Sequence, residues 1–227
     1  MKVDIIHGPG NAAARVNLAN NETVVAEGGA MVAMSSHVAI RTTTHQKSKG
    51  GILRGLKRLL SGESFFLNHF TATAEGAHVT LAPTLSGDIH ALELNNDRII
   101  VQSGSYVASE ASVEMNTGWQ GFQSLFAKEG LFWINLFGQG KVLVNSFGAI
   151  YPIKVEGEYI VDTGHIVAFD ETLKFSLSKA GKSWFSSILG GEGLVCRFQG
   201  TGTVWCQSHN ASAFGRSLGQ QLKPIKK

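Results

Sequence analysis

Hydrophobic residues occur in short runs along most of the chain, and Val and Ile dominate these runs. The runs span four to eight residues and are separated by turn-forming groups such as Asn20-Asn21, Ser86-Gly87-Asp88 and Glu156-Gly157. Short β-branched runs with this punctuation are typical of antiparallel strands joined by tight connections. The pattern therefore predicts an all-β fold.

The strand pattern contains an internal repeat. Residues 20–33 match residues 95–108 at five of 14 positions, and residues 99–108 match residues 159–168 at five of ten. Each copy carries an anchor glycine that is followed three and four residues later by Val-Ala; the anchors are Gly29, Gly104 and Gly164. Because the anchors lie inside a strand pattern, we expect a bulge, a bend or close backbone packing at each.

A second repeated block follows downstream, and its recurring acids are Glu63, Glu129 and Glu192. In the second and third copies it continues into Phe followed by Gly-x-Gly, within residues 137–142 and 198–204, which predicts a hairpin turn. Each glutamate is expected to begin a strand and to accept backbone N–H bonds. Cation binding or acid–base chemistry by three neighbouring carboxylates is the less favoured alternative.

Three units follow from the repeat, at approximately 13–87, 88–152 and 153–210. One unit alone would leave an apolar sheet face bare, so we expect the three to pack as one domain over residues 1–227, around a pseudo-threefold axis. Residues 211–227 are predicted to form a short helical, basic tail.

An apolar insert lies between the anchor and the glutamate block of every unit. The first has helical spacing of its apolar residues, with cationic side chains on the opposite face. Together the inserts define a candidate contact surface: Ile52, Leu53, Leu56, Leu59, Leu60, Arg54, Lys57, Arg58, Trp119, Phe122, Trp184 and Phe185. Two interpretations stay open. The inserts either cap the β-core or form an exposed rim that binds an anionic membrane, a protein partner or another copy of the chain.

Charge is unevenly distributed. Residues 28–62 contain six bases and no acid, and residues 193–227 contain five bases and no acid, so the remaining nine bases and seventeen acids give the rest a net charge of −8. The overall charge of +3 therefore averages two basic segments with an acidic body.

Composition excludes several classes of protein. Hydrophobic residues make up 43% of the chain, which excludes intrinsic disorder. The longest apolar runs are shorter than a membrane-spanning helix, and residues 1–6 lack a signal-peptide core, so we expect a soluble, cytoplasmic protein.

No catalytic, metal-binding or nucleotide-binding motif is present, so no enzyme activity, metal or cofactor is expected. The two cysteines, Cys196 and Cys206, are expected to be partly buried free thiols, although a hairpin at Gly200-Gly202 would bring them together.

The segment Glu27-Gly28-Gly29-Ala30-Met31, preceded by Leu18 and Glu22, resembles the opening of a bacterial family of unknown function. That family is related to the altered-inheritance-of-mitochondria protein, and the later glutamate blocks are similar too. The resemblance implies a β-fold like that of the tryptophan RNA-binding attenuation protein (TRAP-like), similar to a double-stranded β-helix, with three units per chain. It defines no catalytic residues, and the mitochondrial relative is linked to inner-membrane organisation.

The sequence therefore predicts a non-enzymatic interaction or scaffold protein. We expect a homo-oligomer at the periphery of the inner face of the membrane, acting through the apolar inserts. The alternative is an RNA-binding protein that uses basic segments 41–58 and 197–227. Few aromatic side chains lie beside these bases, and this argues against the alternative.

Overall fold

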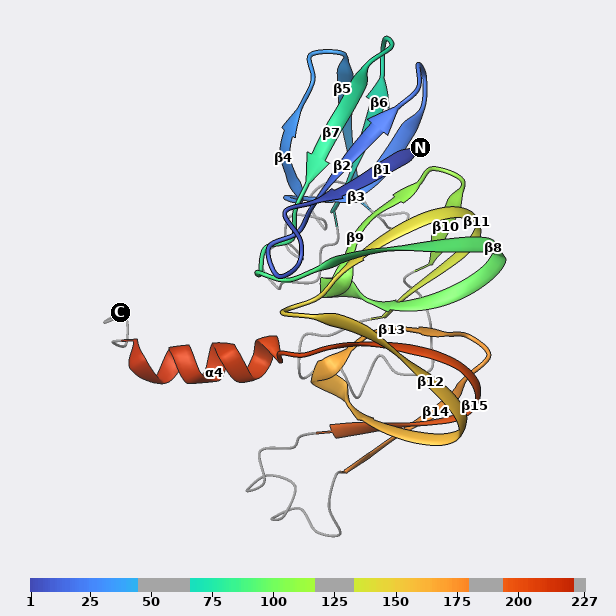
Figure 1. Ribbon diagram of the computed structural model, residues 1–227, viewed down its shortest axis with the longest axis vertical. Helices are drawn as coiled ribbons and strands as arrows, with labels where there is room; N and C mark the ends of the chain where they lie inside the picture. The colour runs from blue at the N-terminus through green and yellow to red at the C-terminus, as the bar shows by residue number, and fades with distance from the viewer. Residues whose placement is uncertain (45–65, 117–132, 180–193, 223–227) are drawn as a thin grey trace.

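Antiparallel strands make up most of the computed structural model, which describes residues 1–44, 66–116, 133–179 and 194–222 (Figure 1). The all-β prediction is confirmed, and a single described α-helix, α4 (Ala211–Gln221), follows the last strand. The described strands are β1 (Lys2–Ile6), β2 (Ala13–Leu18), β3 (Thr23–Glu27), β4 (Met31–Met34), β5 (Val38–Thr44), β6 (Phe66–Ala72), β7 (Ala77–Leu81), β8 (Ile89–Gln102), β9 (Tyr106–Glu110), β10 (Val113–Asn116), β11 (Trp133–Asn145), β12 (Ile150–Asp162), β13 (Ile166–Asp170), β14 (Lys174–Lys179) and β15 (Leu194–Gln207).

One pattern of strand pairing occurs three times, and we name its copies unit 1 (β2–β7), unit 2 (β8–β11) and unit 3 (β12–β15). In unit 2, β8 and β11 form a long antiparallel ribbon, and β9 and β10 pair with the other edge of β11. In unit 3, β12 and β15 form the ribbon, with β13 and β14 on the other edge of β15. Unit 1 has the same pairings, but its ribbon is divided into β2–β7 and β3–β6.

The predicted Gly-x-Gly hairpins are wrong. Residues 137–142 lie inside β11 and residues 198–204 lie inside β15, and both strands continue through their glycines. Gly140 has a φ of +141°, and a Cβ built on it would lie 2.7 Å from Oε2 of Glu110. The glycines therefore allow each strand to bend: β11 bends where the turn between β9 and β10 crosses it, and β15 bends where the turn between β13 and β14 crosses it. Gly157, predicted to lie in a turn, likewise lies within β12.

The anchor glycines were expected to lie inside strands, but they lie in the connections between strands. Gly104 and Gly164 are the central residues of two single 3-10 turns, Ser103–Ser105 and Thr163–His165, and Gly29 joins β3 to β4 with a φ of +97°. Close packing is found only at Gly164, where an added Cβ would collide with the side chain of Asn210.

Neighbouring units join by one further strand pairing. β3 of unit 1 pairs with β9 of unit 2, and β8 of unit 2 pairs with β13 of unit 3. The units follow one another along the long axis of the molecule, with unit 1 at the top of Figure 1 and unit 3 at the bottom. The strand order ends at β12, so the pseudo-threefold axis and the TRAP-like assignment stay predictions.

The hydrophobic core crosses these junctions. Val107 and Ala108 of β9 pack in the cluster of buried unit 1 residues that contains Val24 and Ala26. In the same way, Val167 of β13 packs in the buried cluster of unit 2. Units 2 and 3 therefore each complete the core of the unit before them.

Candidate functional site

All the predicted contact-surface residues, and with them Glu63, Glu129 and Glu192, lie outside the described residues. The strands that flank each insert are described, and in every unit they form an antiparallel pair. The last described pairs are Thr44 with Phe66, Asn116 with Asn135, and Lys179 with Leu194. The three inserts are therefore topologically equivalent connections, although whether they cap the core or form a rim stays a prediction.

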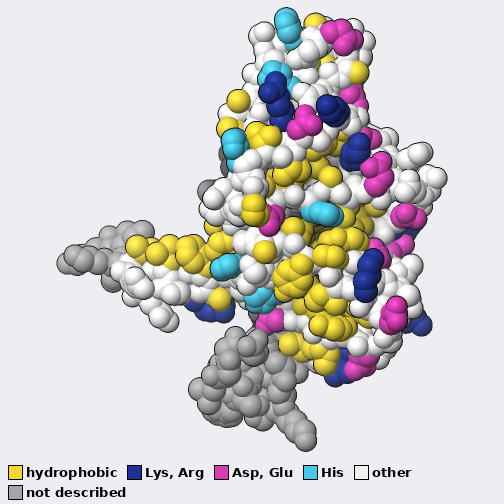
Figure 2. All heavy atoms as spheres, in the orientation of Figure 1, with side chains coloured by type: hydrophobic (Ala, Val, Ile, Leu, Met, Phe, Trp, Pro, Cys, Tyr) yellow, Lys and Arg dark blue, Asp and Glu magenta, His cyan; other side chains and the backbone are white. Residues whose placement is uncertain are grey.

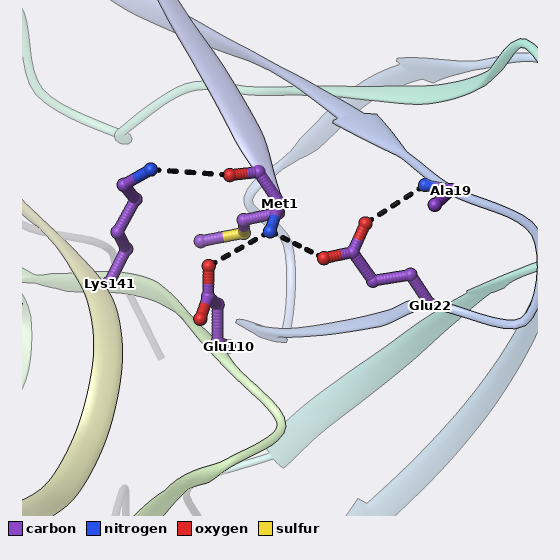
Figure 3. A network of polar contacts seen from close by, with 5 residues as sticks. All are labelled: Met1, Ala19, Glu22, Glu110 and Lys141. Carbon is purple, nitrogen blue, oxygen red and sulfur yellow. Dashed lines mark hydrogen bonds and ion pairs between the residues drawn. The ribbon is translucent and has the colours of Figure 1, made fainter.

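A half-buried polar network fixes the first residue against units 1 and 2 (Figure 3). The α-amine of Met1 forms an ion pair with Glu22 and donates to Glu110 Oε1 at 2.9 Å, while Lys141 Nζ donates to the Met1 carbonyl at 3.3 Å. Burial alone would lower the pKa of the amine, but the hydrogen bonds and charges of the two glutamates outweigh it and raise this pKa. Because both carboxylates have these partners, we assign the network to structure and not to chemistry.

Glu27 is the most perturbed carboxyl group among the described residues. Burial raises the pKa of this carboxyl group to about 7 from an ordinary value of 4.5, and within the described part of the chain its carboxyl oxygens have no hydrogen bond or ion pair. The equivalent positions in units 2 and 3 do have partners: Gln102 accepts from Ser105, and Asp162 accepts from the Gly164 N–H.

The other chemistry-bearing side chains form no reactive cluster. Cys196 and Cys206 are buried free thiols on one strand, β15, so the hairpin that would bring them together does not exist. Burial raises the pKa of each thiol to about 12. No three His, Cys, Asp or Glu side chains in the described ranges are placed to hold a metal ion. Nor does any helix in these ranges combine the length and hydropathy needed to span a bilayer.

Strand β4 exposes apolar residues whose counterparts are buried in the other units. Val32 is 62% exposed, whereas the equivalent Val107 and Val167 are at most 1% exposed. Met34 is 40% exposed, and its counterparts in β9 and β13 are also buried. The difference arises because β9 and β13 each lie between two strands, while β7 is the one partner of β4 among the described strands.

Strand β12 shows the reciprocal feature. Tyr159 and Ile160 are 44% and 47% exposed, although the equivalent Ile99 and Ile100 of β8 are buried. Figure 2 shows that apolar side chains gather on the lower half of the body, the half that unit 3 forms in Figure 1. The exposure of both strands was not predicted from the sequence, because their residues match those of the buried copies. The signal that could have indicated it is that the first and last units of a repeat each lack one neighbouring unit.

Helix α4 is a third exposed apolar element, and it projects away from the body (Figure 1). None of its residues is buried. Phe214, Leu218 and Leu222 recur every four residues and therefore share one face, which Figure 2 shows as an apolar row along the helix.

Comparisons with known proteins identify one family model and two similar streptococcal proteins. The family model described as Mitochondrial biogenesis AIM24 matches residues 3–209. An uncharacterized protein of Streptococcus pyogenes serotype M6 is 30% identical over 213 residues, which cover 91% of this chain and 85% of that protein. The crystal structure of a Streptococcus pyogenes protein superimposes with a TM-score of 0.80 at 27% identity, covering 97% of this chain and 99% of the other. Since the family model spans most of the repeat and the strands described above, the chain belongs to the Mitochondrial biogenesis AIM24 family.

Proposed function

We propose that the protein is a non-enzymatic, oligomeric scaffold that docks at the surface of an anionic membrane through exposed apolar segments. The observation that carries this proposal is the exposed apolar face of helix α4. Phe214 contacts the ring of Phe147 at the base of the helix, whereas Leu218 and Leu222, farther along the same face, are 47% and 63% exposed. An isolated helix of fewer than about 12–15 residues is marginal in water, so a helix of this length gains most of its stability from a surface on which it rests.

The base of the helix is held firmly. Ser208 and His209 donate their backbone N–H groups to the carbonyls of Ala149 and Phe147, at 3.0 and 3.1 Å. Asn210 caps the helix by accepting from the Ala213 N–H at 3.0 Å. These contacts fix the first turn, and they leave the remaining turns free to bind a partner surface.

Charge complementarity selects an anionic surface. The chain from residue 193 to its last residue contains no acid, and it carries Arg216 within the helix and Lys223, Lys226 and Lys227 after it. Each base near an anionic leaflet contributes about 1 kcal/mol of attraction. An amphipathic helix with a basic flank suits the interface between headgroups and acyl chains. The apolar inserts, with Trp119 and Trp184, are proposed to add to this contact.

Vesicle flotation tests the proposal. We expect the full chain to float with vesicles of anionic lipid. In the double variant Leu218→Ser/Leu222→Ser the fraction of protein bound to vesicles should fall by about tenfold or more, because two leucines no longer enter the interface. The matched control, Ser212→Ala/Gln220→Ala, alters the polar face of the same helix and should float like the wild type. A second variant, Leu56→Glu/Trp119→Glu/Trp184→Glu, alters the inserts. The proposal would be contradicted if this variant and the leucine variant both floated as well as the control.

RNA binding is not favoured by the described residues. Arg197, in the second basic segment, forms an ion pair with Glu158, and Gln199 donates to the same carboxylate. Retention of RNA on filters that strengthens at low salt would replace the membrane proposal with this alternative.

A further inference from the structure

The two ends of the array of units are complementary to each other. Inside the chain, the first ribbon strand of each unit pairs with the strand after the anchor of the next unit, as in β3–β9 and β8–β13. Among the described strands, β12 has no such partner on its outer edge, and neither does β4. One chain therefore carries both halves of a third junction of the same kind.

The two internal junctions share a register. The residue three positions before an anchor glycine pairs with the residue four positions after the next anchor, which gives Ala26 with Ala108 and Val101 with Ala168. At the preceding position, Ile100 pairs with Phe169. Applied to the free strands, this register aligns Val161 with Ala33 and Ile160 with Met34, and it extends to Tyr159 with Ser35.

The residue types on the free edges suit pairing and do not prevent it. Exposed edge strands usually carry charges or proline, which block association. Residues 150–158 of β12 do so, with Pro152, Lys154, Glu156 and Glu158, but Tyr159–Val161 are uncharged and apolar. The strand then ends at Asp162, whose carboxylate accepts from the Gly164 N–H of its own chain. β8 is divided in the same way: its charged residues precede Ile99, and Ile99–Val101 are the residues that pair with β13. β4 contains only apolar residues.

Val32 supplies the matching core contact. Its counterparts Val107 and Val167 pack in the buried cluster of the preceding unit. The unit that would precede Val32 must offer the features of unit 3, where Val155 and Val161 belong to the third buried cluster. Because unit 1 and unit 3 lie at opposite ends of the long axis (Figure 1), β4 cannot reach β12 of its own chain.

We propose that copies of this chain assemble head to tail, with β4 of one copy pairing antiparallel with residues 159–161 of β12 in the next copy. Such a junction is heterologous, since different surfaces of the two copies meet, and it generates a ring when the rotation between copies closes. This inference does not depend on membrane docking, which involves α4 and the inserts.

Disulfide trapping tests the register directly. The variants Ile160→Cys and Met34→Cys are made separately and mixed under mild oxidation; directly opposed residues of an antiparallel pair lie at about 4.5–5.5 Å between Cα atoms, within the range that a disulfide spans. The mixture should yield a covalent pair of twice the chain mass of 24.3 kDa, and each variant alone should yield little. The native thiols do not interfere, because both are buried.

Controls keep the result decisive. Tyr151→Cys is similarly exposed on β12, but it lies nine residues from Ile160, about 30 Å along a strand, and it should not link to Met34→Cys. A second pair in the same register, Tyr159→Cys with Ser35→Cys, replaces the first if either variant fails to fold. The proposal is overturned if neither mixture links, if Tyr151→Cys links equally well, or if Ile160→Cys alone links as fast as the mixture, which would indicate β12–β12 pairing.

Discussion

Glu27 offers the sharpest test of the electrostatics of the junction between units 1 and 2. Glu27 is the last residue of β3, directly before the Gly28-Gly29 connection, and burial raises the pKa of its carboxyl group to about 7. Unit 2 has glutamine, Gln102, at the equivalent position, so Glu27→Gln introduces a side chain that unit 2 accommodates at the end of its first ribbon strand. We predict that this substitution stabilises the protein at pH 8.

The sign follows from proton linkage. Between pH 4.5 and about 7, the folded state holds the Glu27 proton more tightly than the unfolded state does, so the stability contributed by this group falls as the pH rises through that window. Above pH 7 both states are ionised, and the folded state bears the full cost of a buried charge. A shift of about 2.5 pKa units corresponds to a ceiling of about 3.4 kcal/mol at about 1.36 kcal/mol per unit, and the partial access of water to this side chain reduces the expected value to about 1–3 kcal/mol.

Urea unfolding at pH 5 and pH 8 measures the effect. Glu27→Gln should raise the free energy of unfolding by about 1–3 kcal/mol at pH 8 and by less than about 1 kcal/mol at pH 5. The control Glu114→Gln alters an exposed glutamate and should change stability equally little at both pH values. If Glu27→Gln gives the same change at both pH values, or destabilises the protein at pH 8, the burial argument is wrong.

Two further predictions concern packing. Gly164→Ala should cost about 1–3 kcal/mol in urea unfolding, because its Cβ would meet Asn210. Gly104→Ala, whose added Cβ has no atom of the described residues within 4 Å, should cost less than about 1 kcal/mol, and equal costs would contradict the packing account. Cys196 and Cys206 should resist alkylation in the folded protein at pH 8 and react fully in denaturant, because burial raises both pKa values to about 12; rapid labelling of the native protein would contradict this.

Sequence patterns predicted the strands well, because a half-buried strand needs β-branched residues wherever it lies in the fold. The recurrence of anchors and Val-Ala pairs also corresponds to a recurring ladder, with Gly29, Gly104 and Gly164 each following the first ribbon strand of a unit. Helix α4 was predicted from its position and composition, and its register is visible in the spacing of Phe214 and Leu218.

The direction of the chain at the Gly-x-Gly segments could not be predicted in the same way. Hairpin turns and strand bends both favour glycine, because both place residues at positive φ. What decides the outcome is a distant contact, the approach of the turn after β9 to Gly140, which local sequence does not encode.

The exposure of β4 and of Tyr159–Ile160 in β12 could not be predicted from the sequence either. Val32, Val107 and Val167 have the same identity and the same local pattern, so nothing local separates the exposed copy from the two buried copies. Burial here depends on whether another unit precedes the strand. The sequence directed attention to the inserts, whereas the described structure directs it to the two ends of the array and to α4.

The mass of the assembled protein tests the central claim most directly. Light scattering on the full chain at tens of micromolar should give a mass that is a multiple of 24.3 kDa, and replacing the exposed valine of β4 by Val32→Asp should return the protein to the mass of one chain with its fold intact. A wild-type protein that remains at 24.3 kDa at every concentration, or a Val32→Asp variant with an unchanged assembled mass, would contradict head-to-tail assembly through β4 and β12.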